Sequence, residues 1–447
     1  MINRSMLKLG LAAPFAAALV VAAPAAAEED ATGFDIEGNI RVRYEAMDGN
    51  FRPGGVESDD AVLLRSLVSA NYTGTGFRVG ATLQDSRAYA NDASTPLGNA
   101  DINALELIEL YARLDLAENV SVTAGRQTVN LGSKRLLGNP GYRNAANAFT
   151  GARVDFADLG GGSLTAFYML PQQRLPSSKS DILDNAVEWD HEGDDQVFWG
   201  AFYKRPDLGP LTLEAYVYVL DESDTATVAT RDRQLVTPSL RLYSAQARGR
   251  FDGEVEAMYQ TGSISASRAA SAAELDVEAF SAHAELGYTF DHALKPRVAV
   301  LYDFASGDDP SSASYNNFDP LFGPRYSDWG PSGLFGPLSR NNIVSLGALV
   351  ASKISARVDA QLQYRRNWLE EATDSFAKTG VRDATGAAGT DAGSQLQGRL
   401  RWWVIPGLLR HEVGGGVLFK GSFFDAAPND TGFGNTHYGY SALEVSF

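Results

Sequence analysis

The sequence contains no cysteine among its 447 residues. A disulfide framework is therefore excluded, as is thiolate chemistry at a metal site or a nucleophile. Histidine is also scarce: there are five, they do not cluster in the sequence, and no Ser/His pair is recognisable as a catalytic arrangement. We therefore expect a protein that is not an enzyme, with no catalytic residues, no resident metal and no cofactor.

Long apolar runs are also missing. Beyond residue 27, no stretch reaches the roughly 18 apolar residues that a membrane-spanning helix needs. The hydrophobic content of 44% and the mean hydropathy of −0.18 would suit a water-soluble protein. A membrane protein with this composition would have to hide its apolar residues by alternating them with polar ones.

The first 27 residues are predicted to be a signal peptide. Arg4 and Lys8 give a basic start, Leu9 to Val21 is apolar, and three alanines precede Glu28. An N-terminal anchor helix is the alternative, but the apolar core is short and rich in alanine. We expect two units, a signal peptide over 1–27 and a single β-barrel domain over 28–447. Too few residues precede the first expected strand at Phe34 for a large N-terminal plug.

Positive charge is in the minority. Lysine and arginine number 38 against 55 acidic residues, a net charge of −17 that becomes about −19 once Arg4 and Lys8 are removed. This balance argues against nucleic acid as a partner. Seven carboxylates lie between residues 181 and 195, and their oxygens could hold calcium. Their spacing matches no calcium-binding loop, so a solvated acidic surface is the favoured interpretation.

The chain does contain one repeated unit: runs of about ten residues alternate apolar with polar, and the breaks between them are alternately very short and long. This pattern is typical of a transmembrane antiparallel β-barrel with short periplasmic turns and long extracellular loops. The runs predict an all-β barrel of about 18 strands in the bacterial outer membrane, surrounded by outer-membrane lipid. An even number of strands puts both ends of the barrel on the periplasmic side. The longest breaks follow strands five, seven, thirteen and fifteen.

The end of the chain supports this location. Leu443, Val445 and the terminal Phe447 alternate on one face, with Tyr438 and Tyr440 just upstream. This resembles the C-terminal signal of proteins inserted by the barrel assembly machinery, which we therefore expect as a partner during biogenesis.

Alternation also assigns the two faces of each strand. In Phe34 to Glu45, Ile36, Ile40, Val42 and Tyr44 are predicted to face outward, with Glu37, Asn39, Arg41 and Arg43 facing inward. In Leu211 to Val219, Glu214, Tyr216 and Tyr218 fall on the inward face. Along the whole chain, this phase gives a set of inward arginines: Arg41, Arg43, Arg65, Arg113, Arg153, Arg241, Arg297, Arg365, Arg399 and Arg401. Interleaved with them are inward carboxylates: Glu109, Asp115, Asp155, Glu256, Asp303, Asp359 and Glu412.

The inward arginines allow two interpretations. Guanidinium groups pair bidentately with carboxylate and phosphate, so they could guide an anionic solute through the lumen. Alternatively, Arg/Asp pairs only solvate and brace a wall that must be polar. Arg365, Arg399 and Arg401, on neighbouring strands, form the best cationic cluster, and barrel closure should bring Arg41 and Arg43 close to it.

One stretch is family-specific. It runs from Gly125 to Gly138 (GRQTVNLGSKRLLG) and is followed by Tyr142-Arg143-Asn144 and by the strand opening Phe149-Thr-Gly-Ala-Arg-Val154. It resembles the alginate-export family of outer-membrane barrels. The resemblance implies a monomeric eighteen-stranded barrel whose arginine-rich lumen passes a uronic-acid polymer. By motif position, it marks Arg126, Arg135, Arg143 and Arg153 as lumen or constriction candidates.

Two breaks are candidates for narrowing the channel. Residues 125–138 are predicted to fold back into the barrel, either for structural reasons or to contact the solute. The break from Asp308 to Arg340 is rich in proline, glycine and aromatic residues and is long enough to be a lid or plug. Its rings could stack on sugars, although packing among themselves is the default expectation.

Three functions remain open. The first is a passive channel for small anionic or saccharide solutes. The second is a dedicated exporter of an anionic exopolysaccharide such as alginate. The third is a barrel enzyme or adhesin, which would need a catalytic arrangement or functional outer loops.

Overall fold

The computed structural model of the protein describes residues 32–225 and 229–447, so the predicted signal peptide lies outside the described residues. Eighteen antiparallel strands form a single closed sheet, in which each strand pairs with its neighbours in the sequence. The first nine are β1 Gly33–Asp48, β2 Ser58–Gly74, β3 Phe77–Tyr89, β4 Asn103–Ala117, β5 Val120–Thr128, β6 Ala148–Phe156, β7 Ser163–Pro171, β8 Gln196–Leu208 and β9 Leu211–Glu222. The others are β10 Gln234–Ser244, β11 Arg250–Ser265, β12 Glu274–Thr289, β13 Arg297–Ala305, β14 Ile343–Ser355, β15 Val358–Trp368, β16 Asp391–Ile405, β17 Leu409–Lys420 and β18 Thr436–Ser446.

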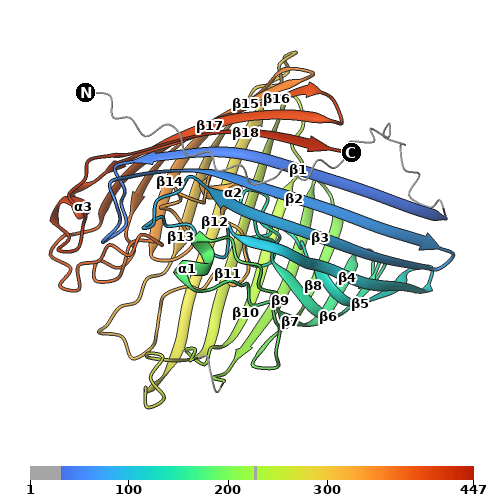
Figure 1. Ribbon diagram of the computed structural model, residues 1–447, viewed down its shortest axis with the longest axis horizontal. Coiled ribbons are helices and arrows are strands. Elements are labelled where there is room, and N and C mark those ends of the chain that lie inside the picture. Colours follow the sequence, from blue (N-terminus) through green and yellow to red (C-terminus); the bar gives the residue numbers. More distant parts are fainter. Residues whose placement is uncertain (1–31, 226–228) are drawn as a thin grey trace.

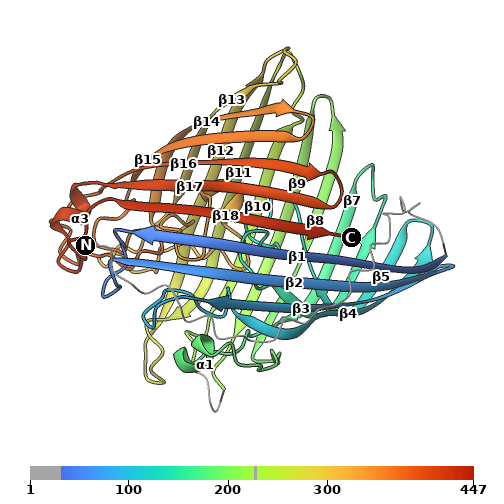
Figure 2. The same cartoon turned by 45° about the horizontal axis from the view of Figure 1, so that its top comes forward.

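The barrel closes between its first and last strands. β1 pairs with β18 from Asn39 opposite Ser446 to Asp48 opposite His437, and both figures show these strands side by side (Figures 1 and 2). Closure leaves no unpaired sheet edge, which is what a strand-built protein needs in lipid. The predicted strand count and antiparallel barrel are confirmed.

The boundaries of β10 differ from the expected ones. The apolar–polar alternation predicts a strand from Leu240 to Ala247, whereas β10 runs from Gln234 to Ser244. Pro238 lies within it, opposite Val217 of β9, and the ladder to β11 is interrupted there because proline has no N–H to donate. Proline and polar neighbours thus concealed the first half of this strand.

The inward and outward phases are also confirmed. On β1, Ile36 and Tyr44 are 62% and 47% exposed, whereas Arg43 and Glu45 are 1% and 0% exposed. On β9, the inward Glu214 and Tyr218 are buried. Large apolar side chains therefore cover the outer wall, and charged side chains line the inner one.

Exposed aromatic residues gather near both ends of the strands. Phe34, Phe77, Phe251, Phe290 and Trp402 lie close to the short turns. Towards the long loops are Tyr44, Tyr89, Trp199, Tyr259, Tyr302 and Tyr364. Two such belts mark the membrane–water interfaces of a transmembrane barrel.

The connections divide by length as predicted. Short turns join the strands at the end where β1 starts and β18 finishes, and the longest loops are 129–147, 172–195, 306–342 and 369–390. Three short helices lie in or beside long loops: α1 Lys179–Leu183, α2 Tyr326–Trp329 and α3 Ser422–Ala426. Within the described residues, no helix has the length and apolar character needed to cross a membrane.

Candidate functional site: the lumen and its loops

Two long loops, 129–147 and 306–342, pack against each other inside the barrel. Asn147 donates from Nδ2 to the Phe322 carbonyl at 3.0 Å, and the Phe322 ring meets Phe149 and Phe198 edge-on at 5.1 and 4.9 Å between centroids. Tyr326 stacks on Tyr142 at 4.9 Å. The predicted fold-back of the first loop is confirmed, and the second loop fills the lumen beside it.

Most aromatic rings of the 306–342 loop are used for this packing. Phe318, Trp329 and Phe335 are 1%, 2% and 0% exposed. Phe335 stacks on Tyr438 of β18 at 4.9 Å. These rings fill the interior of the barrel, so the default expectation of packing holds for them rather than a role as sugar platforms.

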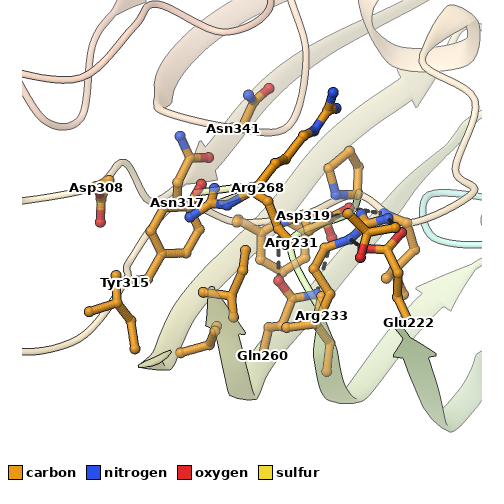
Figure 3. A pocket seen from close by; sticks show the side chains of 18 of the residues that line it. Glu222, Arg231, Arg233, Gln260, Arg268, Asp308, Tyr315, Asn317, Asp319 and Asn341 are labelled. Atoms are coloured by element: carbon orange, nitrogen blue, oxygen red, sulfur yellow. Dashed lines mark hydrogen bonds and ion pairs between the residues drawn. The ribbon is translucent and has the colours of Figure 1, made fainter. Parts of the chain in front are cut away.

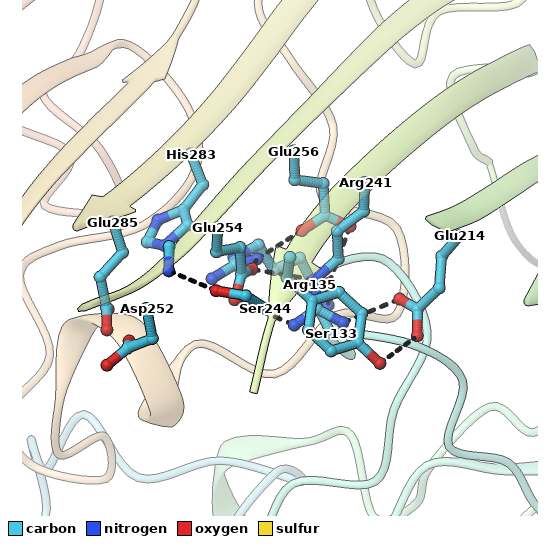
Figure 4. A network of polar contacts seen from close by, with 12 residues as sticks. Ser133, Arg135, Glu214, Arg241, Ser244, Asp252, Glu254, Glu256, His283 and Glu285 are labelled. Atoms are coloured by element: carbon cyan, nitrogen blue, oxygen red, sulfur yellow. Dashed lines mark hydrogen bonds and ion pairs between the residues drawn. The ribbon is translucent and has the colours of Figure 1, made fainter. Parts of the chain in front are cut away.

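Arg135 anchors both loops to the barrel wall. Its guanidinium forms ion pairs with Glu254 and Glu256 of β11, and its Nε donates to Asp328 of α2 at 3.0 Å. Ser133 Oγ and Tyr216 Oη also donate to Glu256, at 2.8 and 2.5 Å. Figure 4 shows Arg135 beside Glu254 and Glu256. This set of contacts, which we call the Arg135 network, neutralises the arginine and fixes the loops.

Eight of the eleven arginines proposed from the sequence lie beside a carboxylate. Their partners are Glu45 for Arg43, Glu444 for Arg65, Asp115 for Arg113, Glu106 and Glu192 for Arg126, Glu254, Glu256 and Asp328 for Arg135, Asp155 for Arg153, Asp303 for Arg365, and Asp359 for Arg401. Within the described residues, the other three, Arg41, Arg143 and Arg399, have no carboxylate at ion-pair distance. A paired arginine attracts a passing anion less, because its charge is already compensated.

Barrel closure brings four of these arginines to one small cavity. A space of about 170 Å³ is lined by Arg41, Arg43, Arg399 and Arg401 together with Tyr326. Arg41 donates to the carbonyl oxygens of Gly141 and Tyr142 at 2.8 and 2.7 Å. Arg399 donates to Tyr326 Oη at 3.0 Å. The expected approach of Arg41 and Arg43 to the β16 arginines is thus present.

Arg365 lies apart from that cavity. It is 1% exposed, pairs with Asp303 at 2.7 Å and lies 4.6 Å from the Trp329 ring. Asp303 also contacts Nδ1 of the buried His283 at 2.8 Å, so both groups belong to the packed wall. Arg113 and Arg153, in contrast, lie at the short-turn end of the barrel, where they line a cavity of about 580 Å³.

A second group of basic residues comes from the loops rather than from the strands. Arg52, Arg143, Arg174, Arg325 and Lys378 each come from a different long loop, and we call them the basic cluster. Arg52 donates to the Leu334 and Phe335 carbonyls at 2.7 and 2.8 Å, and Arg174 to Asn147 Oδ1 at 2.7 Å. These acceptors are uncharged. No member of the cluster forms an ion pair within the described part of the chain.

The charges of the cluster influence one another. Burial is the main cause that lowers the pKa of Arg325 to about 9, and the positive charges of Arg52 and Arg143 contribute to this lowering. Burial also lowers the pKa of Lys378, with additional contributions from Arg325 and Arg143. Asp101 is the carboxylate whose negative charge acts on most members of the cluster. It supplies only one charge, and burial raises its own pKa. The cluster therefore holds several cations that repel one another, which favours binding of an anion.

Only Arg143 of this cluster was proposed from the sequence. Arg52, Arg174, Arg325 and Lys378 lie in irregular loops, where strand alternation assigns no face. The sequence does show that several long loops of this acidic chain each contain a basic residue. It does not show that these loops lie close together in space.

The acidic stretch 181–195 has structural contacts. Asp190 Oδ1 accepts from Asn103 Nδ2 and the Leu175 N–H at 2.7 and 2.8 Å, and Glu192 pairs with Arg126 at 2.7 Å. Across 32–225 and 229–447, no group of three or more metal-ligating side chains has the geometry to hold an ion.

The fold is similar to solved structures from Pseudomonas aeruginosa. OccK8 (OprE) matches with a TM-score of 0.60 at 12% identity, over 93% of this chain and 97% of that one. OccK9 (OpdG) matches with a TM-score of 0.60 at 14% identity, over 93% and 98%. OccK2 (OpdF), solved in complex with glucuronate, matches with a TM-score of 0.57 at 14% identity, over 93% and 99%. At these identities, the similarity establishes the fold alone.

The comparison by sequence identifies the family. No curated protein matches the chain. The alginate export family model matches residues 33–433, which is most of the chain and includes the strands β1 to β17. The chain therefore belongs to the alginate export family, and it is a β-barrel channel of the bacterial outer membrane rather than an enzyme.

Proposed function

We propose that the protein passes small anionic solutes, including sugars that carry a carboxylate, and that the basic cluster selects them. The observation that carries this proposal is the convergence of five cations from five loops without a carboxylate in contact. The guanidinium groups of the cluster have no carboxylate in contact. They can therefore form ion pairs with the carboxylate of a solute that enters the lumen. The glucuronate bound to the structurally similar OccK2 barrel supports a uronate as one such solute.

A dedicated exporter of an anionic polysaccharide is the second candidate, supported by the family match. The packed loops favour the first candidate. A polymer threading the lumen would have to displace a loop held by Phe322, Trp329 and Phe335. A small solute needs only the space beside the loops.

Planar-bilayer recordings test the proposal. The wild-type channel should prefer chloride over potassium in a salt gradient, and the triple variant R143Q/R325Q/K378Q should lose most of that preference. The control is K295Q/K353Q/R357Q, which removes three positive charges from exposed positions at or near the short turns. Cation preference in the wild type, or equal shifts in the two triple variants, would contradict the proposed function.

A further inference from the structure

A large cavity opens among the long loops, beyond the basic cluster. Its volume is about 930 Å³, and its lining comes from the loops after β7, β9, β11, β13 and β15 and from the adjoining strand ends. We call this cavity the vestibule. Figure 3 shows Arg231, Arg268, Tyr315 and Asn317 around it. Lys378 lines it as well, so the vestibule is continuous with the basic cluster.

Contacts among its own residues hold the vestibule in shape. Arg233 pairs with Glu222 at 2.7 Å and with Asp319 at 2.6 Å. Gln260 donates to the Asp319 carbonyl at 3.1 Å and accepts from the Asp319 N–H at 3.0 Å. These bonds join the 306–342 loop to β9 and β11. The cavity is therefore formed before any ligand arrives, which reduces the entropy cost of binding.

Three arginines of the lining form no ion pair within the described residues, although the charges of Arg231 and Arg382 act on Asp308 from a longer distance. Arg231 donates to the Ser265 carbonyl at 2.8 Å, and its guanidinium lies 4.7 Å from the centre of the Tyr315 ring. Arg382 donates from Nε to the Thr373 carbonyl at 2.7 Å. Within 32–225 and 229–447, neither these two nor Arg268 is at ion-pair distance from a carboxylate. They can therefore pair with a carboxylate on a ligand.

The same cavity also offers acceptors and amides. Asp195, Asp308 and Asp374 line it, as do Asn317 and Asn341, and the Asn341 Oδ1 atom is buried without a hydrogen-bond partner. A simple inorganic anion would gain from the arginines but be repelled by the carboxylates. Sugar hydroxyls both donate and accept, so they can satisfy carboxylates, amides and guanidinium groups together. The mixed lining thus fits a saccharide that also carries negative charge.

We infer that the vestibule is a binding site for an acidic oligosaccharide at the extracellular mouth, which adjoins the basic cluster at Lys378 but uses other arginines. Its volume is near the upper end of the range for small-molecule pockets, which suits more than one sugar ring. This inference rests on the proposed function and adds a capture step to it. A site at the outer mouth would concentrate ligand at the entrance of the channel.

Calorimetry on the purified full-length barrel tests the site. Trigalacturonate should bind the wild type, and R268Q/R382Q should weaken its affinity by about tenfold or more, since hydrogen bonds between charged groups are lost. Monomeric galacturonate should bind at least about tenfold more weakly than the trimer, because it fills only part of the cavity. Maltotriose, which lacks carboxylates, should not compete. The variant K295Q/R357Q, altered at the short turns, should bind trigalacturonate as the wild type does.

Three results would overturn the inference. The first is no binding of trigalacturonate by the wild type, and the second is an unchanged trigalacturonate affinity in R268Q/R382Q. The third is equal competition by sulfate at matched ionic strength, which would mean a general attraction for anions. In each case, chloride preference in bilayers would still stand if the basic cluster selects anions. Failure of the proposed function would appear instead as absent chloride preference in the wild type.

Discussion

Arginines in two regions of the same lumen differ in their surroundings. In the Arg135 network, one guanidinium contacts three carboxylates and holds two loops against β11. In the basic cluster, guanidinium groups are held by carbonyl and amide oxygens, and within the described residues they form no ion pair. The partner, rather than the residue type, therefore separates an arginine that builds the channel from one available to the solute.

The largest expected effect comes from removing Arg135. In Arg135→Ala, Glu254, Glu256 and Asp328 would be left close together, and Arg241 beside Glu254 and Arg340 beside Asp328 would be the remaining cations. Breaking a buried ion pair by removing one partner costs about 3–5 kcal/mol. We expect the two inner loops to detach, which would give a larger and noisier conductance in bilayers and faster protease cleavage within 306–342. An unaltered conductance and protease pattern would show that aromatic packing alone holds the loops.

A carboxylate placed in the basic cluster should make the cluster resemble the Arg135 network, in which arginines are paired with carboxylates. In Arg143→Glu, the new side chain can pair with neighbouring cations, so loop stability should not fall, in contrast to Arg135→Ala. The change of two charges, at about 8 Å from a permeating ion, is worth about 1 kcal/mol even in water. We expect the ratio of chloride to potassium permeability to drop by about fivefold or more. A loss of stability with unchanged selectivity would reverse the roles assigned to the two regions.

The sequence accounts for the framework better than for the site. Alternation predicted the eighteen strands and the inward phase of Arg43 and Glu214, because a strand repeats every two residues against a sharp boundary between lipid and water. It could not supply Arg52, Arg325 or Lys378, because loop contacts depend on which loops meet in space. It also could not show which inward arginine meets a carboxylate, since that depends on side chains on neighbouring strands.

Asp190 offers a test through pH. Burial, with a smaller contribution from the negative charge of Glu106, raises its pKa to about 6. A carboxyl group with a raised pKa in the folded state stabilises the fold at low pH. This contribution is lost as the pH rises from about 4 to about 6, up to about 3 kcal/mol for a shift of this size. Above pH 6, the ionised Asp190 also partly compensates the charge of Arg174.

We therefore expect slower exchange of the Leu175 amide, after correction for intrinsic rates, and a slightly stronger chloride preference at pH 5 than at pH 7. Asp190→Asn should make both quantities nearly independent of pH in this range. If the wild type and this variant show the same pH profile, another group is responsible.

The smallest effect is expected at the periplasmic mouth. Arg113 pairs with Asp115 at 3.1 Å, but both side chains are nearly half exposed. Such surface pairs contribute about 0–1 kcal/mol, and salt screens them further. Arg113→Gln should therefore change the free energy of unfolding by less than about 1 kcal/mol and leave chloride preference at 0.15 M salt almost unaltered. A shift in selectivity as large as that of Arg143→Glu would mean that position along the lumen, rather than the presence of a carboxylate partner, determines which arginines the solute meets.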